Sequence, residues 1–204
     1  MASTRGNPGN LGEACVATAH ALIVEHGVER LSLRDVARRL SVSHQAPYKH
    51  FPSRDHLLAE VLRRCFERFA AALAARERFA DPAHDMRSLG RQYLLYALRN
   101  PLDYRLMFGS EWPQAANHPD LLRDARLSFE ILRQALAPLY GGALPDAELT
   151  LNALFVWSAM HGLASIVQSN AMAHLALGET VLSTAVEHVM DMVEAALTAP
   201  RKAR

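Results

Sequence analysis

Residues 31–57 read LSLRDVARRLSVSHQAPYKHFPSRDHL, and the architecture of the protein follows from this stretch. Its first part predicts a short helix over residues 33–40, because apolar residues recur there at i, i+3, i+4 and i+7 and Ser32 is a natural N-cap. A turn at residues 41–43 then leads to a second short helix, expected over residues 44–50. Two short helices joined by a tight turn follow the helix-turn-helix plan, in which the second helix enters the major groove of DNA.

Polar side chains of the kind that contact DNA gather in and around this motif. Gln45 can donate to and accept from an adenine edge, and Lys49 can reach a guanine or a phosphate. Hydroxyl groups and cations nearby suit phosphates, which position a helix without reading the sequence. The residues expected to contact DNA are Ser32, Arg34, Ser43, His44, Gln45, Ala46, Tyr48, Lys49, His50 and Arg54.

The charges are distributed unevenly along the chain. The 204 residues include 22 Lys/Arg and 21 Asp/Glu, a formal net charge of +1, which by itself does not indicate a nucleic-acid partner. Residues 1–64, however, hold nine Lys/Arg against six Asp/Glu, whereas residues 81–200 hold seven against thirteen. A basic reading segment is therefore joined to an acidic body that should keep away from the phosphates.

Helical periodicity continues through the rest of the chain, and we expect an all-α fold. Residues 1–64 should form a three-helix DNA-binding domain that begins with a flexible arm at 1–10. Residues 65–204 should form a helical bundle for regulation and dimerisation. The boundary between these two domains should lie in a long helix that connects them. The helices expected outside the motif span residues 11–26, 53–79, 86–99, 102–108, 119–139, 146–169 and 179–197.

Several other classes of protein are disfavoured. Cys15 and Cys65 lie far apart without a Cys-x-x-Cys pattern, which argues against zinc fingers and disulfide scaffolds. The sequence lacks the His-Glu-x-x-His and Gly-x-Ser-x-Gly motifs and a Gly-rich phosphate loop, so we expect no enzyme, no cofactor and no metal. The N-terminus is too polar for a signal peptide, and polar residues interrupt the uncharged stretch 151–169. A buried helix and a cytoplasmic location are therefore expected.

The motif resembles the N-terminal signature of the tetracycline-repressor (TetR) family of bacterial regulators. The resemblance is carried by Gly27, Ser32, Asp35-Val36-Ala37, Val42-Ser43 and Tyr48-x-His50-Phe51. It implies that residues 33–40 and 44–50 are helices two and three of the family, that Tyr48 meets a phosphate, and that Arg54 takes the usual Lys position. The sequence departs from the pattern at Gln45-Ala46-Pro47, where the family often has Gly-x-Leu, so Pro47 could tilt the reading helix.

Two later segments extend the resemblance over the whole chain. Residues 104–109 and 157–162 look like parts of the C-terminal domain of one TetR subfamily, the WHG type, named after the Trp/His-Gly signature. The family usually encloses a ligand pocket in this domain. Aromatic and Met side chains suit a mostly apolar ligand, with ordinary core packing as the alternative. The pocket residues expected are Tyr93, Tyr96, Tyr104, Met107, Phe108, Trp112, Phe129, Trp157 and His161.

Two stripes of residues predict a surface for a second copy of the chain. One stripe consists of small residues that allow close helix approach, and the other recurs at heptad-like spacing, so the two helices and their symmetry mates could form a four-helix bundle. The alternative is that both stripes face the core of their own chain. The stripes are Ser158, Gly162, Ser165 and Ser169, and Leu182, Val186, Val189, Val193 and Leu197.

These features together predict a transcriptional regulator. We expect a homodimeric repressor that binds a pseudo-palindromic site in double-stranded DNA and is released by a small, mostly apolar ligand. The alternative is a constitutive or architectural DNA-binding protein of the same fold without an inducer.

Overall fold

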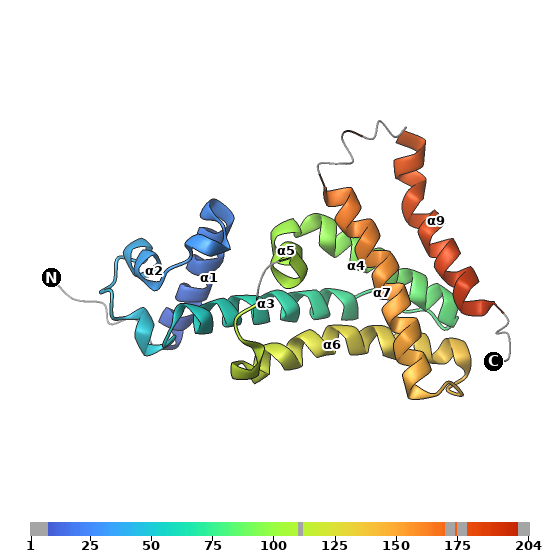
Figure 1. The fold of residues 1–204 in the computed structure, drawn as a ribbon, viewed down its shortest axis with the longest axis horizontal. Coiled ribbons are helices and arrows are strands. Elements are labelled where there is room, and N and C mark those ends of the chain that lie inside the picture. The colour runs from blue at the N-terminus through green and yellow to red at the C-terminus, as the bar shows by residue number, and fades with distance from the viewer. Residues whose placement is uncertain (1–7, 110–111, 170–173, 175–178, 200–204) are drawn as a thin grey trace. The chain divides into compact units, whose positions relative to one another are not determined.

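The computed structural model describes residues 8–109, 112–169, 174 and 179–199. All regular structure in these ranges is helical, which confirms the all-α expectation (Figure 1). Contacts divide the chain into two compact units: unit 1 comprises the residues up to 67 together with 105–125, and unit 2 comprises 68–104 and 126 onward. The segment 105–125 thus lies in the same unit as the first 67 residues.

Unit 1 is built on helix α1 (Pro8–His26), which the 3-10 helix η1 (Val28–Arg30) follows. The buried residues of α1 include Cys15, Ala19 and Ile23, which share one face of the helix. Gly27 ends the helix with a φ of 86°, a conformation that favours glycine, and its N–H donates to the carbonyl of Ile23 at 2.9 Å.

Helix α2 (Leu33–Arg39) has the N-cap that the sequence predicts. The Ser32 hydroxyl accepts a hydrogen bond from the Asp35 N–H at 3.1 Å and donates to the Asp35 carboxylate at 2.6 Å. At the other end Ser41 adopts a φ of 54°, and the Val42 N–H donates to the Ala37 carbonyl at 3.1 Å. This pattern is a Schellman motif with serine in the position where glycine is usual.

The second helix of the motif is not an α-helix. Residues 44–46 form a turn, and only Pro47–Lys49 is helical, as the 3-10 helix η2. Proline has no N–H to donate to the Ser43 carbonyl, and that carbonyl instead accepts from the Ala46 N–H at 2.9 Å. The expected helix over residues 44–50 is therefore wrong, and Pro47 is the physical reason.

Helix α3 (Arg54–Ala74) is shorter than the expected connecting helix, which was to reach residue 79. The Arg76 side chain is buried just beyond its end and donates to the Leu73 carbonyl at 3.2 Å and to the Asp85 carboxylate at 2.6 Å. A guanidinium that satisfies a terminal carbonyl ends the helix here.

The remaining helices are α4 (Pro82–Arg99), α5 (Pro101–Gly109), η3 (Ala115–Asn117), α6 (Pro119–Leu136), η4 (Ala137–Tyr140), α7 (Asp146–Gln168) and α9 (Glu179–Thr198). Within unit 2, α4, α7 and α9 pack against one another, as Figure 1 shows. Asp81 caps α4 by accepting from the His84 N–H at 2.9 Å. Helix α6 ends earlier than expected because Pro138 lacks the N–H that an α-helix requires there.

Helix α7 has an unusual distribution of apolar side chains. It is the one helix in the described part of the chain that is long and apolar enough to cross a membrane by length and composition, and 22% of its most apolar window is buried. It packs on α4 and α9, and its buried residues include Ala153, Val156 and Met160, so it is a bundle helix. Because most of that window remains open, the expectation of a buried helix is met on one face only.

Candidate functional site

The exposed part of the helix-turn-helix carries the groups expected at DNA. Arg34, Lys49 and Tyr48 are exposed, and Tyr48 retains 41% of its surface. The Lys49 N–H donates to the Ala46 carbonyl at 3.3 Å, but in the described part of the chain no hydrogen bond or ion pair engages the side chain of Arg34 or Lys49. Their charges are therefore open to phosphates. Ser43 is also exposed.

The turn before η2 presents two polar side chains to solvent. His44 and Gln45 are exposed, and the Gln45 amide nitrogen lies 3.2 Å from Nε2 of His44. Ala46 beside them is half-buried. Their arrangement in a turn rather than a helix changes which atoms can reach a base edge, but it leaves both functional groups on the surface.

Two of the expected DNA residues are already engaged inside unit 1. His50 is half-buried against α1, where a Cβ on Gly12 would lie 3.4 Å from its Nδ1. The Ser32 hydroxyl is occupied by the capping interaction with Asp35. These positions favour structural roles for Ser32 and His50.

Arg54 is a third such residue. Its Nε donates to the Leu31 carbonyl at 3.1 Å and its Nη2 to the Val28 carbonyl at 2.7 Å, while Nη1 lies 3.5 Å from an Asp55 carboxylate oxygen. The guanidinium thus binds backbone of its own unit.

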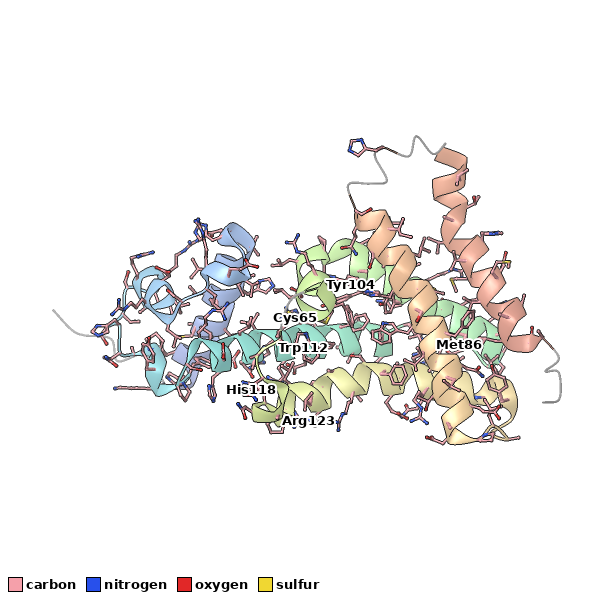
Figure 2. All side chains as sticks on the ribbon, in the orientation of Figure 1. Cys65, Met86, Tyr104, Trp112, His118 and Arg123 are labelled. Atoms are coloured by element: carbon pink, nitrogen blue, oxygen red, sulfur yellow. The ribbon has the colours of Figure 1, made fainter. Side chains whose placement is uncertain are left out.

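The expected pocket residues are divided between the units. In unit 2, the Tyr93 and Tyr104 hydroxyls lie 2.7 Å apart, and the Tyr104 hydroxyl lies 2.6 Å from Nδ1 of His161, as the labelled Tyr104 in Figure 2 helps to locate. Tyr96 donates to Asp103 at 3.2 Å, also within this buried region. Burial raises the pKa of Tyr93 to about 12 and also raises the pKa of Tyr104. These phenols are neutral and form a packed, hydrogen-bonded cluster.

The other aromatic residues of the predicted pocket are also packed. Phe129 and Trp157 contact edge to face in unit 2, with centroids 6.1 Å apart. In unit 1, Met107 is buried and its carbonyl accepts from the Trp112 indole at 3.0 Å, while Phe66 contacts Phe108 edge to face.

A cavity of about 30 Å³ lies elsewhere in unit 2. It shares helices α4 and α7 with the tyrosine cluster, and none of the expected pocket residues lines it. Three methionines and Gly90 contribute to it, and a Cβ on Gly90 would lie 3.0 Å from the Met190 methyl group. The lining consists of Ala83, Met86, Arg87, Gly90, Leu139, Val156, Met160, Met190, Val193, Glu194, Leu197 and Thr198.

Comparisons with known proteins agree with this architecture. The family model described as bacterial regulatory proteins, tetR family, matches residues 16–61. The model described as the tetracyclin repressor-like C-terminal domain matches residues 86–193, more than half of the chain. The chain belongs to the tetR family. Its family and fold are those of bacterial transcriptional regulators.

Individual relatives and solved structures resemble the chain to different extents. The HTH-type transcriptional regulator Rv1816 of Mycobacterium tuberculosis is 32% identical over 101 residues, which are 48% of this chain and 43% of Rv1816. The match thus spans less than half the length of the curated relatives. A solved structure from Rhodococcus sp. RHA1 is 26% identical with a TM-score of 0.72, covering 93% of this chain and 98% of that one. The TetR family transcriptional regulator PfmR of Thermus thermophilus shares the fold at 20% identity, with a TM-score of 0.61 and coverages of 92% and 99%.

The small-residue stripe of this tetR-family protein lies on the open face of α7. Ser158, Ser165 and Ser169 are exposed, and a Cβ on Gly162 would meet nothing within 4 Å beyond its chain neighbours and the backbone of its own helix. Large apolar side chains accompany the stripe. Their exposed fractions are 64% for Leu151, 41% for Leu154, 46% for Phe155 and 53% for Ile166.

The stripe on α9 has a different environment. Val193 is 8% exposed and lines the cavity together with Leu197, while Val186 and Val189 are half-buried. The side chain of Leu182 lies outside the described residues. Burial on α9 therefore favours the alternative, that this stripe faces its own core. The open face of α9 carries Val181 and Met192 instead, at 53% and 60% exposure.

Sequence reasoning missed the groups that join α4 to α9. Arg87 donates to Glu194 at 2.7 Å and also pairs with Asp191, and Arg91 donates to Glu187 at 2.9 Å. These charges lie about a hundred positions apart in the sequence, so no local pattern reveals their pairing. The methionines of the cavity were also missed, because a methionine on an apolar helix face usually belongs to the protein core.

Proposed function

We propose that the chain acts in the cytoplasm as a homodimeric repressor of transcription that binds a pseudo-palindromic DNA site. The observation that carries this proposal is an exposed surface of unit 1, which we call the reading face. It consists of Arg34, His44, Gln45, Tyr48 and Lys49. Neither Arg34 nor Lys49 has an ion-pair partner in the described part of the chain. A single motif makes few contacts, and a two-fold dimer doubles them.

Selection of bound DNA from a random library tests this proposal. We expect enrichment of an inverted repeat whose half-sites suit recognition elements about 34–36 Å apart. Enrichment of one isolated half-site would contradict the dimer. Recovery of unselected DNA would contradict sequence-specific regulation. The sign of regulation is then read by transcription in vitro from a promoter that contains the selected site.

The open apolar face of α7 supports the dimer. Soluble monomers rarely leave a contiguous apolar surface of this kind uncovered. We expect Phe155→Glu to convert the dimer to a monomer in light scattering at micromolar concentration. Leu127→Glu is the matched control, because Leu127 is 51% exposed on another helix, α6. If the wild-type protein is itself monomeric in this light-scattering measurement, the proposal of a dimer is wrong.

Release by a small, mostly apolar ligand is the finer part of the proposal. The methionine-lined cavity supports it, because Met side chains adapt to irregular apolar groups. Its present volume of about 30 Å³ holds only a small group, so binding a larger molecule requires the methionines to move. A displacement screen with the dye 8-anilinonaphthalene-1-sulfonate would identify binders. A binder that leaves operator affinity unchanged at saturation would refute ligand release.

A second candidate function is constitutive or architectural DNA binding without an inducer. The observation that favours it is the closed tyrosine cluster around Tyr104, because residues expected to receive a ligand satisfy one another. Absence of any saturable binder in the displacement screen would support this alternative.

A further inference from the structure

The first residue of α3 holds two distant backbone carbonyls. Arg54 donates to Leu31, 23 positions earlier, and to Val28, 26 positions earlier. Val28 begins η1 and Leu31 follows its end, directly before the Ser32 cap of α2. One side chain therefore ties the start of α3 to the segment that leads into α2.

The chemistry of the contact suits arginine and not lysine. The planar guanidinium presents several N–H groups in a fixed fork, so Nε and Nη2 can serve two carbonyls at once. An ammonium group presents its three N–H groups from a single nitrogen on a flexible chain, so it does not hold two donors at the separate positions of Nε and Nη2. The Val28 carbonyl also accepts from the Leu31 N–H at 3.2 Å, so the segment is held from both sides.

The remaining edge of the guanidinium lies beside an acidic side chain. Nη1 lies 3.5 Å from Asp55, whose carboxylate competes with a phosphate for the same cation. Arg34 and Lys49 differ in this respect, because both are exposed and no acid in the described residues pairs with them.

We infer that Arg54 is a positioning residue for DNA recognition rather than a phosphate contact. It fixes the direction in which α2 and the following turn leave η1, and thereby orients the exposed side chains at Gln45 and Lys49. The inference rests on the proposed reading face, so the test must separate a failure of that face from a failure of the inference.

The test measures affinity for the selected DNA site and for random DNA as a function of salt. The proteins compared are the wild type, Arg54→Lys, Arg54→Met and the control Lys49→Gln. Each phosphate contact contributes about 0.9 to the slope of log affinity against log salt. We expect Lys49→Gln to lose roughly one contact from that slope on both DNAs. An unchanged slope for Lys49→Gln would overturn the reading face itself.

Both Arg54 variants should lose about tenfold in affinity for the selected site, the size of one lost charge-assisted hydrogen bond. Their salt slope should stay at the wild-type value, and their preference for selected over random DNA should fall. A phosphate contact predicts the opposite pattern: Arg54→Lys keeps its affinity, and Arg54→Met loses about one contact from the slope. That pattern would overturn the inference.

Amide hydrogen exchange on DNA-free Arg54→Lys provides a second measurement if Arg54→Met fails to fold. A positioning role predicts faster exchange at the Leu31 amide and in the first turn of α2, with amides in α4 unchanged. Unchanged exchange at Leu31 would overturn the inference, because without DNA a phosphate contact has nothing to hold.

Discussion

The Tyr104 hydroxyl lies 2.6 Å from Nδ1 of His161, and the two rings stack with centroids 5.5 Å apart. A neutral imidazole accepts at one nitrogen and donates at the other. If the phenol donates to Nδ1, the imidazole N–H resides on Nε2, which faces the Ser165 hydroxyl at 3.4 Å. The buried cluster thus reaches from Tyr93 on α4 to the open face of α7.

Removing the Tyr104 hydroxyl should destabilise the protein. Tyr104→Phe leaves the buried groups of Tyr93 and His161 without their shared partner, at a cost of about 1–3 kcal/mol in the free energy of unfolding. Urea denaturation measures this change. Tyr48→Phe is the matched control, because Tyr48 is 41% exposed and the same deletion there should leave stability unchanged. Equal stability of both variants would show that the hydrogen bonds of the cluster contribute nothing net.

The protein should lose stability in acid through two histidines. Burial lowers the pKa of His161, and burial together with the nearby His56 lowers that of His118, although Asp55 opposes this shift. A folded-state pKa below the unfolded value gives stability that is present above the unfolded pKa and lost as pH falls through the folded pKa. We expect the free energy of unfolding to fall as the pH drops below about 6.5, the pKa of an unperturbed histidine. The decline should be shallower in His161→Gln and in His118→Gln, and parallel curves for all three proteins would refute this origin.

Local signals predicted the helices well and failed where distant side chains decide the outcome. Ser32 and Gly27 mark the ends of their helices because capping and a positive φ depend on neighbouring residues alone. The end of α3 depends on Arg76, whose partner Asp85 lies in the next helix. The 3-10 conformation at Pro47 was partly predictable, because the sequence already indicated that the proline could tilt the helix.

The candidate site shows the same division between local and distant effects. The exposure of Arg34 could be predicted from the sequence, because helix periodicity places it away from the buried residues Leu33, Val36 and Ala37 of α2. The packing of the predicted pocket residues could not be derived from the sequence. The pocket residues were chosen by chemical type, and the structure joins Tyr93, Tyr104 and His161 directly, leaving the cavity among residues such as Met160. The role of Arg54 was likewise hidden, because its carbonyl partners lie more than twenty positions away.

Ser41 offers a stabilising substitution in the helix-turn-helix. Its φ of 54° is a conformation that costs L-residues roughly 1–2 kcal/mol and costs glycine little. We expect Ser41→Gly to raise the free energy of unfolding by about 0.5–1 kcal/mol, because glycine loses part of the gain through its more flexible unfolded state. Ser43→Gly provides the control. Among the described non-glycine residues only Ser41 has a positive φ, so glycine at position 43 relieves no such strain. The control should lower stability, and a gain of the same size there would refute the strain argument.

Gln45 should determine sequence preference without contributing to the salt dependence. Its amide is exposed beside His44, where it can pair with a base edge, and it carries no charge to displace counterions. We expect Gln45→Ala to lose about 1–3 kcal/mol of discrimination at one base position per half-site, with the salt slope unchanged. Repeating the DNA selection with the variant identifies that position. If Gln45→Ala weakens binding to selected and random DNA equally, the side chain contacts the backbone of DNA, and base reading falls to other residues of the turn.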